Sequence, residues 1–250
     1  MSARLRTLKN ELKIQKSVQE ASEPKKYPKR LPRWKDRNIF FSILAFRLLN
    51  AFTTKTFFQA DEFFQLLEPA HQLVFGYGFI TWEWKEKLRS SIHPLIFATV
   101  YKCVLLLGLA DRWEKLLVIA TPKIVGAIVA ATSELFLYKW VRTYTQSEDL
   151  SRIALFVSLT NPFNLFFSTR SFLNNFEGMI TIVALSYWPW HKSSNNVILA
   201  DIFPLYLGVL SCIVRPTNSI LWGCVGVWTL IHANSAVEKS KILFRAIVAG

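Results

Sequence analysis

The sequence has 250 residues, of which 52% are hydrophobic and 14% aromatic, and its formal charge at pH 7 is +13. From Ile39 onward it consists mostly of long apolar runs of a length that suits bilayer crossing, whereas the first 38 residues contain almost no apolar cluster. This division excludes a soluble globular enzyme, a fibrous repeat and a wholly disordered chain. It predicts an all-α polytopic integral membrane protein with a polar N-terminal tail.

Residues 1–38 carry most of the charge. They hold twelve Lys or Arg against four Asp or Glu, so this tail supplies +8 of the +13. A basic segment can bind nucleic acid, but its position directly before the first apolar run makes the positive-inside rule the simpler explanation, with no nucleic-acid partner. Three prolines and nine charges between residues 22 and 37 make it too polar to bury a core. We therefore expect 1–38 to be a disordered, basic, cytosolic tail.

Seven apolar runs follow the tail, and an eighth begins near Ile242. At about twenty residues per crossing, each is a candidate membrane helix. Because the eighth run continues to the last residue, we expect 39–250 to be the N-terminal part of a longer catalytic membrane domain. The seven candidate helices are 39–58, 94–110, 116–141, 153–168, 176–190, 197–214 and 220–233.

The distribution of Lys and Arg predicts the direction of the spans. With the tail in the cytosol, the first span runs outward and residues 59–92 lie on the lumenal or extracellular side. The loops 139–152, 191–196 and 234–241 are basic and are expected in the cytosol. One net crossing then remains between residues 90 and 139, although two apolar runs lie there. We therefore expect one of them, most simply 94–110, to be re-entrant or only partly inserted.

Residues 59–92 contain the pattern of an interfacial amphipathic helix. Polar residues recur at i, i+4, i+7 and i+11, while the other faces are apolar through Phe63, Phe64, Leu66, Leu67 and Ala70. Such a helix lies flat at the membrane surface and holds its carboxylates at headgroup level. The polar positions are Asp61, Gln65, Glu68 and Gln72. The two tryptophans that follow, Trp82 and Trp84, are typical of an interfacial aromatic belt.

The adjacent carboxylates Asp61 and Glu62 begin this helix. Alone they fit a solvated helix start, where negative charge is favoured by the helix dipole. Four cationic or titratable side chains follow within the same loop and could meet a phosphate at the interface. They are Lys85, Lys87, Arg89 and His93. For the two lysines, anchoring to lipid headgroups is the simpler interpretation.

Charged residues within or beside the candidate spans add to this set. Arg47 lies inside the first span, where an arginine is costly and faces a cavity or a partner. The segment STRSFLNNFE places Arg170 and Glu177 at the mouth of a later span, and Arg215 begins a turn between two others. The predicted topology opens these residues and the 59–92 loop onto one compartment. Such a set of charges could bind a lipid-linked phosphorylated substrate. It could equally form the rim of a transporter vestibule.

The common motifs of soluble enzymes are missing from the sequence. It contains no glycine-rich phosphate loop, dinucleotide fingerprint, HExxH or GxSxG. Cys103, Cys212 and Cys224 are too far apart for a zinc site or a disulfide framework. Nothing in the sequence requires a metal or another cofactor, because fixed cations can balance a phosphate.

The run FQADEFFQLLEPAHQLVFGYGFITWEWKEKLRSSIHPL resembles the lumenal loop of the endoplasmic-reticulum mannosyltransferases of glycosyltransferase family 22. The segments TRSFLNNFE and IVRPTN look like further motifs of that family, so the resemblance covers roughly residues 38–235. Within the family, the loop is most similar to the branch that adds the third mannose to glycosylphosphatidylinositol (GPI) precursors. The family's acidic pair usually follows a Pro-containing dipeptide such as His-Pro, whereas here it follows Gln59-Ala60.

The resemblance implies a GT-C type transmembrane helix bundle in the endoplasmic-reticulum membrane, with a cytosolic N-terminus and a lumenal catalytic loop, 59–92, after the first span. It implies an α-1,2-mannosyltransferase that transfers mannose, with inversion, from dolichyl phosphate mannose to a GPI precursor glycolipid. Asp61 is then the expected general base and Glu62 its catalytic neighbour. The residues expected to bind the donor phosphate or the substrate are Arg89, His93, Arg170, Glu177 and Arg215.

Three alternatives stay open at this point. A second family-22 activity, in the lipid-linked precursor pathway of N-glycans, differs only in its acceptor. A lipid or solute transporter would line its path with Arg47, Glu177 and Arg215, although the sequence shows no internal repeat of the kind common in transporters. In a non-catalytic membrane subunit, Asp61 would only cap a helix.

Overall fold

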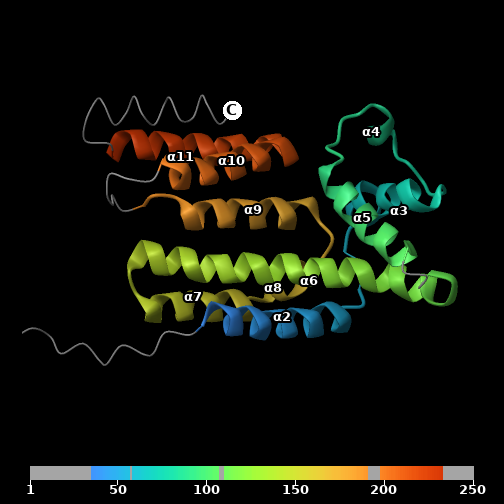
Figure 1. Cartoon of the computed structure of the whole chain (residues 1–250), viewed down its shortest axis with the longest axis horizontal. Coiled ribbons are helices and arrows are strands. Elements are labelled where there is room, and N and C mark those ends of the chain that lie inside the picture. Colours follow the sequence, from blue (N-terminus) through green and yellow to red (C-terminus); the bar gives the residue numbers. More distant parts are fainter. Residues whose placement is uncertain (1–34, 57, 107–109, 191–197, 233–250) are drawn as a thin grey trace, which may run out of the picture. The chain divides into compact units, whose positions relative to one another are not determined.

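The computed structural model describes residues 35–56, 58–106, 110–190 and 198–232, and all regular elements within these ranges are helices (Figure 1). The all-α class predicted from the sequence is therefore confirmed for the described residues. Most of the predicted tail lies outside them, as do the loops 191–196 and 234–241 and the eighth apolar run. Only residues 35–38 of the tail are described, and helix α2 (Asp36–Thr53) already begins there.

The long helices coincide with the predicted apolar runs. They are α2, α5 (Ile92–Leu106), α6 (Ala110–Thr145), α7 (Glu148–Thr160), α9 (Leu173–Tyr187), α10 (Ile198–Val214) and α11 (Ser219–His232). Among the described residues, one helical stretch, Val118–Thr145 within α6, is long and apolar enough to cross a membrane; Ile92–Leu106 and Ile202–Val214 are apolar but shorter. The number and direction of the crossings stay predictions.

The run predicted as one helix over 153–168 is interrupted. Helix α7 ends at Thr160, and the short helix α8 (Pro162–Phe167) begins after Asn161. The side-chain oxygen of Asn161 accepts hydrogen bonds from the backbone N–H groups of Phe163 and Asn164, which caps α8. Pro162 fits the first helical position because its missing N–H would have no partner there. The prediction of a continuous helix is therefore wrong at this point.

Helix α6 packs against α2, α7 and α9, and α9 packs in turn against α10 (Figure 1). One core cluster joins α2, α6 and α7 and consists of Ile39, Ile43, Ala131, Leu135, Tyr138 and Leu155. Small residues on α6 allow close approach: a Cβ atom added at Gly126 would lie 2.1 Å from the carbonyl oxygen of Thr169. Glycine is therefore required where α6 meets the chain that follows α8.

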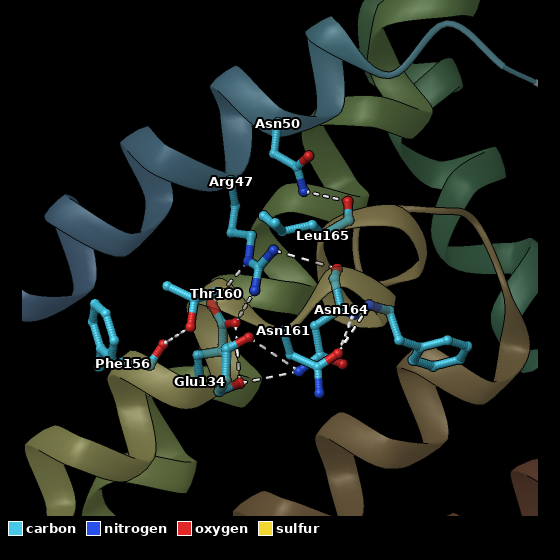
Figure 2. A network of polar contacts seen from close by, with 10 residues as sticks. Arg47, Asn50, Glu134, Phe156, Thr160, Asn161, Asn164 and Leu165 are labelled. Carbon is cyan, nitrogen blue, oxygen red and sulfur yellow. Dashed lines mark hydrogen bonds and ion pairs between the residues drawn. The ribbon is translucent and has the colours of Figure 1, made fainter.

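Arg47 lies fully buried on α2 and forms an ion pair with the buried Glu134 of α6 (Figure 2). Its Nη1 also donates to the carbonyl oxygen of Asn164 at 3.4 Å. One turn further along α2, the amide of Asn50 donates to the carbonyl oxygen of Leu165 at 2.8 Å. The expectation that Arg47 faces a partner is confirmed, and the polar face of α2 holds α8 in place.

The predicted amphipathic helix is present over residues 61–75, as a first turn, a π-helical segment η1 (Phe63–Leu67) and helix α3 (Glu68–Phe75). Gly76 ends it with φ of +81°, a left-handed conformation that favours glycine. Its apolar side packs on α5 through a second cluster, Leu66, Ala70, Phe97, Ala98 and Tyr101. Whether the α5 run is partly inserted in the membrane stays a prediction.

Candidate active site

A pocket of about 380 Å³ lies where four segments distant in the sequence meet. The segments are the start of the amphipathic helix, the stretch from α4 (Trp82–Lys85) to the start of α5, the chain between α8 and α9, and the residue after α10. Its lining residues are Gln59, Asp61, Gln65, Leu66, Trp84, Arg89, Ser90, His93, Pro94, Phe167, Ser171, Phe172, Leu173, Asn174 and Arg215.

Asp61 lines this pocket from the first turn of the amphipathic helix and is half-buried. Its carboxylate makes no hydrogen bond or ion pair with any other residue that the structure describes. A carboxylate whose oxygens are open to a pocket can accept a proton from a bound hydroxyl group. Of the two adjacent acids, Asp61 is the one whose carboxylate is open to the pocket.

Glu62 points to a different neighbour. It is buried, with 8% of its surface exposed, and its carboxylate lies 3.0 Å from Nη1 of the equally buried Arg170. The same guanidinium donates to the carbonyl oxygens of Thr56 and Phe166, each at 2.9 Å, and to the hydroxyl oxygen of Thr56 at 3.0 Å. The Glu62–Arg170 pair therefore holds the chain on both sides of Asp61 without lining the pocket.

Arg89 lines the pocket and makes a bidentate ion pair with Glu83. Its Nε donates to one carboxylate oxygen at 2.9 Å, and its Nη2 donates to the other at 3.2 Å. Nη1 has no partner within the described part of the chain and can meet a ligand. The bidentate contact with Glu83 fixes the guanidinium plane and leaves the end that carries Nη1 for an anion such as a phosphate.

His93 lines the pocket from the start of α5, and only 4% of its surface is exposed. Its ring stacks on Phe176 with a centroid distance of 4.9 Å and an angle of 17°. Burial lowers its pKa from 6.5 to about 4. The imidazole is therefore neutral at neutral pH, where it can exchange hydrogen bonds with a ligand but adds no charge.

Arg215 reaches the pocket from the residue after α10, just before the 3₁₀ turn η2 (Pro216–Asn218). Its Nη1 donates to the side-chain oxygen of Asn174 at 2.6 Å and lies 3.4 Å from the carboxylate of Glu177. Its side chain is 40% exposed. Glu177 is not among the residues that line the pocket, and it orients Arg215 from α9.

Four of the seven residues predicted as site residues thus meet in one pocket: Asp61, Arg89, His93 and Arg215. The other three form ion pairs beside it: Glu62 with Arg170, and Glu177 with Arg215. No described cluster of His, Cys, Asp and Glu could hold a metal ion.

Sequence reasoning missed the amide side chains of Gln59 and Asn174, and it assigned Trp84 to the membrane interface. Gln65 could have been predicted to line the pocket, because it lies on the same polar helix face as Asp61. No local pattern indicates that Trp84 lines the pocket while Trp82, two residues away, does not.

Comparison with known proteins gives the class to which this fold and pocket belong. Over residues 38–250 the chain matches the Alg9-like mannosyltransferase family, and it belongs to that family. No solved structure gives a significant match.

Individual proteins of known name within this class are similar to the chain over most of its length. The chain is 46% identical over 210 residues to GPI mannosyltransferase 3 of Candida albicans, covering 84% of this chain and 41% of that protein. It is 44% identical over 219 residues to GPI mannosyltransferase 3 of Debaryomyces hansenii, covering 87% and 38%. Mannosyltransferase APTG1 of Arabidopsis thaliana is 35% identical over 223 residues, covering 89% and 40%. The chain thus spans about two fifths of the length of these relatives.

Proposed function

We propose that this chain carries the base-bearing pocket of a mannosyltransferase in GPI-anchor synthesis in the endoplasmic-reticulum membrane. The proposed reaction is α-1,2 transfer of the third mannose, from dolichyl phosphate mannose to a GPI precursor glycolipid, with the pocket facing the lumen. Family membership and the names of the relatives support the class of reaction. The observation that carries the chemistry is the unpaired Asp61 carboxylate in a pocket that Arg89 and Arg215 also line.

In the proposed mechanism Asp61 is the general base. It removes the proton from the acceptor hydroxyl as that oxygen attacks the anomeric carbon of the donor mannose. The bond between the anomeric carbon and the phosphate oxygen breaks, and dolichyl phosphate leaves with the bonding electron pair. A single displacement converts a β-linked donor into an α-linked product.

The arginines would stabilise the charge on the departing phosphate. Arg89 offers Nη1, and its other nitrogens are held by Glu83. Arg215 offers the nitrogens that Asn174 and Glu177 do not engage. Preoriented donors of this kind act at the moment when charge develops, without having to reorganise. His93, being neutral, would serve as a hydrogen-bonding group.

Glu62 and Arg170 take a positioning role in this proposal. Their buried ion pair joins the residue after Asp61 to the chain that precedes α9, and Arg170 also binds Thr56 on the other side of Asp61. Such support holds a base within the small tolerance that proton transfer requires. This assignment differs from the direct catalytic role for Glu62 and the phosphate-binding role for Arg170 that the family resemblance suggests.

The test uses cells that lack the third GPI mannosyltransferase and receive the full-length gene encoding this chain. We expect the wild-type gene to restore the precursor with three mannoses. Asp61→Asn keeps the side-chain volume but removes the base, so transfer should fall about 10²- to 10⁴-fold. Glu86→Gln is the matched control, because Glu86 is an exposed carboxylate of the same loop that does not line the pocket.

Two results would contradict the proposal. Activity of Asp61→Asn equal to that of the Glu86→Gln control would show that Asp61 is not the base. Correction of N-glycan precursors instead of GPI precursors by the wild-type gene would assign the chain to the other family-22 pathway.

A second variant, Arg89→Lys, separates two roles of this cation. Lysine keeps the charge but cannot hold the bidentate contact with Glu83. Loss of transfer in this variant would support a fixed phosphate contact. Full activity would favour simple anchoring to lipid headgroups.

A further inference from the structure

The two tryptophans of α4 occupy different environments although only one residue separates them. Trp82 is 65% exposed and does not line the pocket. Trp84 is half-buried and lines the pocket together with Asp61 and Gln65. An interfacial belt would give both residues the same role, so this difference calls for a separate explanation for Trp84.

The indole of Trp84 is fixed to the helix that carries the base. Its Nε1–H donates to the carbonyl oxygen of Phe64 at 3.1 Å. In the π-helix η1 each carbonyl oxygen accepts from the N–H group five residues later, as the carbonyl of Phe63 does from the N–H of Glu68. By the same pattern, the carbonyl of Phe64 would accept from the N–H of residue 69. Position 69 is a proline, which has no N–H, so the carbonyl of Phe64 is open to another donor. The indole provides that donor and is thereby linked to the helix that carries Asp61.

The polar lining of the pocket includes three uncharged amide side chains. Gln59, Gln65 and Asn174 all reach the pocket, and a primary amide can both donate and accept hydrogen bonds. Hydroxyl groups have the same double capacity, so amides suit a sugar. A pyranose ring also has an apolar face of C–H groups, which an aromatic ring with a polar handle can cover.

The acceptor hydroxyl must lie next to the base, because the proton that Asp61 removes belongs to it, whereas the donor phosphate leaves from the opposite side of the anomeric carbon. Gln65 is one helical turn beyond Asp61 and lines the pocket with it. Trp84 is bound to Phe64, in the same turn. The donor phosphate needs cations, and these come from Arg89 and Arg215.

Resting on the proposed function, we propose that Trp84 and Gln65 form the acceptor-sugar subsite. The indole packs on the C–H face of the terminal mannose of the acceptor, and the amide of Gln65 bonds to one of its hydroxyl groups. The mannose is thereby oriented with its reacting hydroxyl toward Asp61.

Steady-state transfer by the full-length enzyme, in membranes or in detergent, tests this subsite with Trp84→Ala, Trp84→Phe and the matched control Trp82→Ala. The acceptor is a GPI precursor with two mannoses, and the donor is dolichyl phosphate mannose. We expect Trp84→Ala to raise the KM for the acceptor about tenfold while the KM for the donor changes less than about twofold. Trp84→Phe keeps a ring but loses the N–H, so its acceptor KM should lie between those of the wild type and Trp84→Ala. Trp82→Ala should match the wild type.

Several outcomes overturn the subsite. One is an unchanged acceptor KM in both Trp84 variants, and another is an equal rise in Trp82→Ala. A lower melting temperature of Trp84→Phe with wild-type acceptor KM, or complete loss of its activity, would show that Trp84 only supports η1. Failure of the wild-type enzyme to transfer mannose to this acceptor would refute the proposed function itself and is thus distinguishable from failure of the subsite.

Discussion

Replacing Arg47 with methionine tests how far the helix bundle depends on the buried ion pair with Glu134. Arg47 is 0% exposed and Glu134 is 5% exposed, so water cannot solvate either charge when its partner is removed. In the Arg47→Met variant, the carboxylate of Glu134 would retain the hydroxyl of Ser158, 3.3 Å away, as its remaining described partner. One neutral hydrogen bond does not compensate for a buried charge.

The magnitude follows from the burial of both partners. Breaking a fully buried ion pair by removing one partner costs about 3–5 kcal/mol. Replacing both partners with apolar residues removes the desolvation penalty as well, so the double variant Arg47→Met/Glu134→Leu should recover to within about 1 kcal/mol of the wild type. At about 2 °C per kcal/mol for a large domain, the single variant should melt about 6–10 °C lower.

The assay is thermal unfolding of the full-length protein in detergent, followed for the wild type, both single variants and the double variant. The four melting temperatures form a double-mutant cycle that isolates the pairwise contribution. The reasoning is refuted if the double variant loses as much stability as the sum of the single variants. It is also refuted if Arg47→Met melts at the wild-type temperature.

Three further predictions concern the close contact at Gly126, the cap of α8 and the role of Glu62. Gly126→Ala should destabilise by about 1–3 kcal/mol, because the new Cβ would lie 2.1 Å from a backbone oxygen. Gly178→Ala is the matched control: its Cβ would meet no atom within 4 Å, and alanine favours a helix interior over glycine, so its melting temperature should not fall. Asn161→Ala removes the cap of α8 and should cost about 1 kcal/mol in the same assay; no loss of stability would show that the cap is dispensable. Glu62→Gln keeps a hydrogen-bond acceptor for Arg170, so its single-turnover transfer rate should fall far less than the roughly 10²- to 10⁴-fold loss for Asp61→Asn; an equal loss would assign Glu62 a direct catalytic role.

The helices could be predicted because, inside a bilayer, a long apolar run can satisfy its backbone hydrogen bonds within itself only as a helix. The amphipathic helix after α2 was also predictable, because its polar stripe has helical spacing. The break at Asn161 was missed even though Asn-Pro is a local turn signal, because the surrounding residues are apolar on both sides. Pro69 was a second local indication that was missed. Its missing N–H leaves the carbonyl oxygen of Phe64 open to another donor, which is the indole of Trp84.

The candidate site was only partly predictable, for a different reason. Charged residues in or near apolar runs can be recognised as unusual, which identified Asp61 and the arginines. Which charges pair with one another depends on helix packing: Arg170 meets Glu62 across 108 positions, and Arg47 meets Glu134 across 87. Local spacing holds no information at that range, so the neighbours of each charge became known only from the structure.

The residues that line the pocket are far apart in the sequence and are therefore synthesised at different times. Its lining residues range from Gln59 to Arg215 along the chain. A membrane protein is inserted as it is translated, from the N-terminus onward. The acidic residue Asp61 therefore emerges long before Arg215, and the pocket cannot close around a substrate until the ribosome has passed the end of α10. A nascent chain that stalls earlier would hold Asp61 without this arginine, and its pocket would be incomplete.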